Sequence, residues 1–347
     1  MRMVVSREGK KEGKAMGSAP GPRWGLEAPD PHPKPNTTGV WGLSAPMGVE
    51  GAKPLVLLYF LPSLLRTLPM TALADVEVWS GKDRADENFP VGSALIRPDL
   101  RVHVHAYYRF ARNADDIGDS ETLAAEDKIA RLDVMEDVLL GRRENSSPSA
   151  LGLRTTLAAT GLDPSVATDL LRAFRQDALK HRYANWAELL DYCRYSAMPV
   201  GRLLLTLHGE SAATLPPSDA LCASLQVLNH LQDCAQDLAT LDRCYLPLDL
   251  MKLAGARIED LRLHHSTPAL RDVFDRLLDH VDKLNAEATR LPGLVRDRRM
   301  RLESAVIVGL AHRLTRRLRR GDPLAYRVKL TKADFVLATV AALRYLP

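Results

Sequence analysis

Three carboxylates, Asp115, Asp116 and Asp119, lie close together in the stretch RFARNADDIGDS. An apolar stripe at helical spacing begins at Val104 and continues in steps of three and four into Asp115 and then Asp119, whereas Asp116 lies off this line. Two like charges held four residues apart on one helix repel each other, which costs stability unless a cation lies between them. The spacing therefore indicates a cation site at the end of this helix.

A second polar stripe occurs in the segment LQVLNHLQDCAQDLATLDRCYLP. Gln226, Asn229, Asp233 and Asp237 are spaced i, i+3, i+7 and i+11, so they project within a narrow sector of one helix. The sector could be a solvated face, because apolar residues occupy the opposite side. However, it contains no Lys or Arg, whereas solvated faces usually mix charges of both signs. On its own, this helix leaves both a solvent face and a functional site open.

Two acidic helices in one chain favour a metal site. Mg²⁺ prefers oxygen ligands and typically takes one or two carboxylates per ion, while waters and substrate phosphates supply the rest. Facing Asp pairs would hold several Mg²⁺ ions, and such a cluster binds diphosphate and stabilises it as a leaving group. A di-iron bundle is the competing carboxylate site, but it needs Glu-x-x-His ligation, which neither acidic helix carries.

The sequence around these motifs predicts helices throughout. No alternating strand pattern and no βαβ rhythm occurs, and Pro, Gly and Ser signals separate the amphipathic segments. We therefore expect an all-α fold, with one helical domain over residues 75–347. The expected helices are 99–118, 122–140, 150–160, 164–182, 186–208, 218–239, 257–264, 268–290, 295–320 and 332–345.

Residues 1–74 are expected to lie outside this domain, as a disordered extension or as sequence upstream of the true start. Up to about residue 53 the chain is rich in Gly, Pro and Lys, so it cannot bury enough apolar surface to offset its ordering entropy. The apolar run that follows ends in Ala72-Leu73-Ala74, formally a signal-peptide pattern, but it begins too late and contains two prolines. We favour translation that starts at Met70, with a membrane-associating or export segment as the alternative.

Composition narrows the functional classes. The formal charge of +4 arises from 47 basic and 43 acidic residues, which gives little support for nucleic-acid binding. The four cysteines form no CxxC pair and the ten histidines form no ligand cluster. These features are typical of a cytoplasmic protein with reduced thiols.

The paired acidic motifs resemble those of the squalene/phytoene synthase family of head-to-head prenyltransferases. That family carries one DxxxD motif on each of two facing helices, and here they are Asp115-x-x-x-Asp119 and Asp233-x-x-x-Asp237. The resemblance covers roughly residues 78–330. It implies an isoprenoid synthase fold, in which a helical bundle surrounds a central cavity, and Mg²⁺ as cofactor.

Further segments carry the same resemblance. The Gln and Asn upstream of the second motif are Gln226 and Asn229, the family's R-x-YLP begins at Arg243, and DYCRYSAMPVG is similar to a family segment with an active-site tyrosine. The resemblance therefore implies metal binding by Asp115, Asp116, Asp119, Asp233 and Asp237, substrate binding by Arg112, Tyr108, Gln226, Asn229, Arg243 and Tyr245, and catalytic roles for Tyr192, Arg112 and Asn229.

Within the family, ENFPVGSALI and SAMPVGRLLLTLHGE are most similar to the bacterial hopanoid-pathway hydroxysqualene synthases. That similarity implies conversion of presqualene diphosphate to hydroxysqualene, with loss of diphosphate, rearrangement and capture of the carbocation by water. One departure is DENFPVGS, which stands where many relatives have a Ser/Lys-rich, phosphate-binding segment.

Other activities share the same aspartates. A presqualene diphosphate synthase, a squalene synthase or a phytoene synthase would condense two prenyl diphosphates such as farnesyl diphosphate, and the sequence leaves the use of NADPH open. A catalytically inactive scaffold of the same fold is a third alternative, against which the intact Asp motifs argue.

Two features concern the surroundings of the site. Tyr108, with Tyr107 and Phe110, is expected in the core or in a pocket wall, where aromatic faces stabilise cations. The basic run HRLTRRLRRGDP either ends a solvated helix or binds acidic lipid headgroups. Because the implied substrate has thirty carbons, we expect a cytoplasmic enzyme with peripheral contact at the inner membrane face and neighbouring squalene-pathway enzymes as partners.

Overall fold

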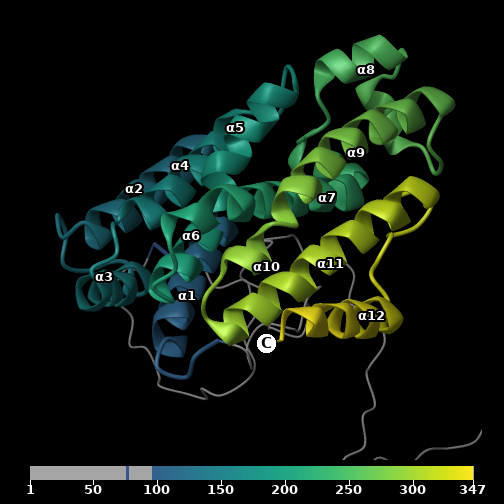
Figure 1. The fold of residues 1–347 in the computed structure, drawn as a ribbon. Helices are drawn as coiled ribbons and strands as arrows, with labels where there is room; N and C mark the ends of the chain where they lie inside the picture. The colour runs from purple at the N-terminus through teal and green to yellow at the C-terminus, as the bar shows by residue number, and fades with distance from the viewer. Residues whose placement is uncertain (1–75, 78–95, 347) are drawn as a thin grey trace, which may run out of the picture. The chain divides into compact units, whose positions relative to one another are not determined.

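The computed structural model describes residues 76–77 and 96–346, and within these ranges all regular elements are helices (Figure 1). The expectation of an all-α fold is thus confirmed for the described part of the chain. Its α-helices are α1 (Arg101–Gly118), α2 (Ala125–Leu139), α3 (Pro148–Thr160), α4 (Ser165–Leu179), α5 (Trp186–Ser196), α6 (Met198–Leu207), α7 (Leu215–Leu241), α8 (Leu248–Ala254), α9 (Pro268–Ala288), α10 (Leu291–Leu294), α11 (Arg298–Arg320) and α12 (Lys332–Ala342).

Short polar side chains set where the helices near the site begin and end. Asp297 accepts a hydrogen bond from the backbone N–H of Met300 and so caps α11. Thr331 and Asp334 form a reciprocal capping box at the start of α12. At the other end of α7, Asp242 adopts a left-handed conformation with φ of 51°, which turns the chain back toward the bundle.

The structure corrects several expected helix boundaries. The single helix expected over 186–208 is two helices that are separated at Ala197, because Pro199 lacks a backbone N–H and its ring clashes with the carbonyl four residues earlier in a continuous helix. The helix expected over 257–264 is a short 3₁₀ turn, Ile258–Arg262. The short helices α8 and α10 were not expected at all, since each is too brief to show apolar periodicity.

Helix α7 lies at the centre of the packing. It contacts α5, α6, α9 and α11, and nearly all of its side chains from Pro217 to Asp233 are buried. On the other side of the bundle, α1 packs against α2, α3 and α4. One continuous apolar cluster extends from α1 to α11, and a small second cluster lies between α11 and α12.

Several expectations fall on residues that the structure does not describe. The proposed start at Met70, the domain boundary at residue 75 and the DENFPVGS segment all lie there. In the described ranges, no helix has the length and apolar content needed to cross a membrane.

Candidate active site

The aspartates of the first motif lie at the C-terminal end of α1. Asp115 is buried, with 9% of its surface exposed, as its place on the apolar stripe predicts. Arg112 forms ion pairs with Asp115 at 3.3 Å and with Asp116 at 3.0 Å. The arginine one turn earlier therefore reduces the repulsion between neighbouring carboxylates.

The polar stripe of α7 is buried rather than solvated. Gln226, Asn229, Asp233 and Asp237 are each no more than 5% exposed. The solvent-face alternative is wrong, because helices pack against α7 on several sides and bury these four side chains. Buried carboxylates need hydrogen bonds or counter-charges, so this stripe depends on its surroundings.

Arg243 connects the two acidic helices. Its Nη1 lies 2.6 Å from Oδ1 of Asp119, and its Nη2 donates a hydrogen bond of 2.8 Å to the carbonyl of Gly118. Its backbone N–H donates to the carbonyl of Asp237 on α7. Burial alone would lower the pKa of Arg243, but the surrounding acidic groups, Asp177 foremost, raise it above its ordinary value, so the guanidinium stays charged.

A pocket lies between the ends of these helices. It brings together seven of the residues implied as functional, and five others (Arg112, Asp116, Tyr108, Asn229 and Asp233) do not line it. The lining residues are Asp115, Asp119, Phe174, Asp177, Tyr192, Ser196, Gln226, His230, Asp237, Leu241, Arg243 and Tyr245. Both aspartates of the first motif, Asp115 and Asp119, thus face the same space as Asp237 of the second.

Asp233 contacts a different part of the chain. Nη2 of Arg327 lies 3.2 Å from Oδ1 of Asp233, and Gln232 donates a hydrogen bond to the carbonyl of Val328. The segment between α11 and α12 therefore covers this side of α7 and supplies a cation to its buried carboxylate. Lys329 of this segment and Lys332, the first residue of α12, are exposed.

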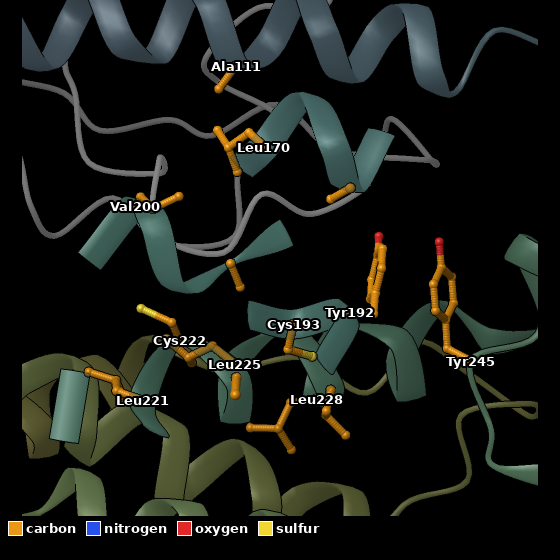
Figure 2. Packing of buried hydrophobic residues seen from close by; sticks show 14 of the residues in the cluster. Ala111, Leu170, Tyr192, Cys193, Val200, Leu221, Cys222, Leu225, Leu228 and Tyr245 are labelled. Carbon is orange, nitrogen blue, oxygen red and sulfur yellow. The ribbon is translucent and has the colours of Figure 1, made fainter. Parts of the chain in front are cut away.

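Tyr192 and Tyr245 form one wall of the pocket. Figure 2 shows their rings side by side with the hydroxyls toward the same side, and their centroids are 5.6 Å apart. Both hydroxyls donate to one carboxylate, that of Asp177, at 2.8 Å and 3.2 Å. Burial raises the pKa of each tyrosine well above its ordinary value, so both stay protonated and cannot act as bases near neutral pH.

Asp177 was not identified from the sequence. It projects from α4 and is 4% exposed, and burial raises its pKa to about 6, against the opposing influence of Arg243 and of the two tyrosine hydroxyls. A signal was available, because Asp177 follows Phe174 by three residues on the apolar face of its helix. The same reasoning that singled out Asp115 would have found it.

The raised pKa of Asp177 predicts a pH-dependent effect of Asp177→Asn. The carboxyl group of Asp177 binds its proton more tightly in the folded state than in the unfolded chain. The protonated group therefore contributes its full stability below about pH 4, and this contribution is lost as the pH rises through 6. Relative to wild type, the variant should therefore gain stability between pH 4 and pH 7, by at most about 3 kcal/mol. Melting temperatures across this range test the prediction, and parallel curves for the two proteins would contradict it.

His230 contributes an uncharged ring to the pocket. Burial, with Arg243 nearby, lowers the pKa of His230 to about 3. Its ring stacks on that of Tyr245 with centroids 3.6 Å apart, and its Nδ1 lies 4.0 Å from Asp237. Because this histidine is neutral, it does not offset the charge of Asp237.

The donor set has the chemistry that Mg²⁺ prefers. The motif residues offer carboxylate oxygens and the carboxamide oxygens of Gln226 and Asn229. As placed, no three Asp, Glu, His or Cys side chains of the described residues are grouped closely enough to hold a metal ion. Arginines contact both motifs instead, so cations already offset the carboxylate charge there.

A helical bundle in which two acidic helices face one pocket is the architecture of an isoprenoid synthase. Residues 82–334 match the family model for squalene/phytoene synthase. The chain therefore belongs to the squalene/phytoene synthase family, an enzyme family that includes head-to-head prenyltransferases. The resemblance inferred from the acidic motifs is confirmed.

Relatives cover most of the same region. A hydroxysqualene synthase of Rhodopseudomonas palustris is 48% identical over 267 residues, which are 77% of this chain and 91% of that protein. Another, of Sinorhizobium fredii, is 46% identical over 74% of this chain and 88% of its own length. The crystal structure of squalene synthase HpnC from Alicyclobacillus acidocaldarius is 34% identical, covers 65% of this chain and 86% of that one, and has a TM-score of 0.59.

Proposed function

We propose that this enzyme converts presqualene diphosphate to hydroxysqualene in a Mg²⁺-dependent reaction. One structural observation carries the proposal: α1 and α7 each present a buried aspartate to one pocket, and Arg243 connects the two helices. The identities of 48% and 46% to two hydroxysqualene synthases support this choice of substrate and product within the family.

The reaction begins with departure of diphosphate. The carbon–oxygen bond breaks and its electron pair leaves with the diphosphate, so negative charge develops on the leaving group. Asp115, Asp116, Asp119, Asp233 and Asp237 would hold Mg²⁺, which supplies charge stabilisation for that leaving group. Arg112 and Arg243 lie beside these carboxylates and would bind phosphate oxygens as well.

The organic cation that remains needs a pocket without strong nucleophiles. Tyr192 lines the pocket, where an aromatic face would stabilise a nearby cation by about 0.5–2 kcal/mol, whereas the ring of Tyr245 is stacked on that of His230. Asp177 holds both hydroxyls and so fixes the orientation of these rings. After rearrangement of the cyclopropylcarbinyl cation, a water oxygen adds to the carbon and a proton is released, which gives hydroxysqualene.

We place this reaction in squalene and hopanoid biosynthesis in the cytoplasm. The substrate and product are long isoprenoids, so the proposal includes peripheral contact with the inner face of the membrane and exchange with neighbouring squalene-pathway enzymes.

Product analysis with two substrates tests the assignment. We expect purified protein with Mg²⁺ to convert presqualene diphosphate to hydroxysqualene without NADPH, as seen by mass spectrometry of extracted lipids. Formation of presqualene diphosphate from farnesyl diphosphate, or of squalene only with NADPH, would assign a different reaction within the family. Absence of any product from either substrate would favour an inactive scaffold.

A further inference from the structure

Helix α12 exposes an apolar face to the surroundings. The exposed fractions of Val336, Leu337, Val340 and Leu343 are 61%, 50%, 59% and 50%. Its opposite face packs on α11, where Ala338 and Ala342 join a small apolar cluster with residues of that helix. The exposed stripe is therefore separate from the contacts that hold α12 in place.

This face lacks the charges that a solvated helix normally carries. Between Lys332 and Arg344, at its two ends, the only charged residue is Asp334, which is buried and paired with Arg317 at 2.6 Å. Half of the large apolar side chains that are exposed in the described ranges fall within residues 326–346. A concentration of this kind marks an interaction surface.

A basic cleft borders the start of α12, at Asp334. Six of its lining residues are cationic: Arg313, Arg316, Arg317, Arg320, Arg327 and Lys329. Its only acidic lining residue is Asp334 of α12, which Arg317 and Arg313 already engage. Among the described residues, Arg316, Arg320 and Lys329 form no ion pair with an acidic group. The cleft therefore has uncompensated positive charge where it meets the apolar helix.

We infer that α12 and this cleft form a docking surface for a bilayer that contains acidic phospholipids. The apolar stripe of α12 would lie in the interfacial layer, while the arginines of the cleft bind headgroup phosphates. Charge complementarity selects this occupant over a second copy of the chain, because pairing two copies through α12 would bring two cationic clefts toward each other. This role rests on the proposed function, because the substrate and product of that reaction partition into membranes and the enzyme would reach them through this surface.

Vesicle co-sedimentation of the full chain, without substrate, tests the inference. We expect binding to phosphatidylcholine vesicles that contain phosphatidylglycerol, much weaker binding to phosphatidylcholine alone, and loss of binding at high salt. Val336→Asp/Val340→Asp and Arg316→Glu/Arg320→Glu should each weaken binding by about tenfold or more. Leu179→Asp/Leu253→Asp is the matched apolar control, since these side chains are similarly exposed on α4 and α8, and it should bind as wild type.

Other outcomes would overturn the inference. Unchanged binding of the α12 and arginine variants would remove this surface as the docking site. A change in oligomeric state of Val336→Asp/Val340→Asp, measured by light scattering, with no change in vesicle binding, would assign the face to a second copy instead. Asp115→Asn should bind vesicles as wild type even if it is inactive, so failure of the proposed function and failure of the docking surface are distinguishable.

Discussion

Replacement of Asp115 or Asp237 with asparagine is expected to lower kcat for diphosphate release by about 10²–10³-fold. Each carboxylate is buried in the pocket, one from α1 and one from α7, and the change removes a charge while it preserves shape. Without that charge, the Mg²⁺ that the pair would hold is bound more weakly and the leaving diphosphate is less stabilised. Helix content and melting temperature should stay close to those of wild type.

Steady-state kinetics with varied Mg²⁺ concentration measures this effect. Both variants should need more Mg²⁺ for half-maximal activity, and excess metal should restore only part of the rate. Asp272→Asn on α9 is the matched control, since it removes an exposed carboxylate far along the chain from either motif. Full activity in Asp115→Asn or Asp237→Asn would refute the role proposed for the acidic pair.

Replacement of Arg243 with alanine is expected to cost about 3–5 kcal/mol of stability, the effect of breaking a buried ion pair. The substitution leaves Asp119 without its 2.6 Å partner and removes the positive charge near buried Asp177. For a domain of this size, the melting temperature should fall by about 10 °C. Activity should also fall, because the connection between α1 and α7 is lost.

Two further variants separate charge from packing. Arg243→Lys keeps the charge but cannot contact Asp119 and the Gly118 carbonyl together, so its loss of stability should be intermediate. Arg243→Ala leaves the buried carboxylate of Asp177 without a nearby positive charge, and Asp177→Asn removes that carboxylate. The double variant Arg243→Ala/Asp177→Asn should therefore be more stable than the sum of the two single effects predicts. Additive effects in thermal unfolding would show that Arg243 and Asp177 do not interact.

Local pattern was sufficient to predict the two acidic helices. The apolar stripe of α1 predicted burial of Asp115 and Asp119, which is confirmed for Asp115, whereas the side chain of Asp119 is 22% exposed. The one-sided polar stripe of α7 placed four side chains in one sector. Periodicity could not tell a solvated sector from a buried one, because that depends on which helices pack around α7. The combination of two such helices, with the family resemblance, resolved the ambiguity.

Most of the features that could not be predicted from the sequence are contacts between residues far apart in the chain. Arg243 and Asp119 are 124 residues apart, and Arg327 and Asp233 are 94 apart, so no spacing rule connects them. Asp177 was overlooked because it occurs singly on its helix, without a second carboxylate to mark it. The exposed face of α12 also required the structure, since apolar residues in a short helix usually indicate core packing.

The fate of oxygen during turnover tests the central claim most directly. Presqualene diphosphate is incubated with the enzyme and Mg²⁺ in H₂¹⁸O without a reductant, and both products are analysed by mass spectrometry. The account predicts ¹⁸O in the hydroxyl of hydroxysqualene and none in the released diphosphate, because the carbon–oxygen bond breaks and water captures the cation. Label in the diphosphate, or no alcohol and formation of squalene only when NADPH is added, would contradict it.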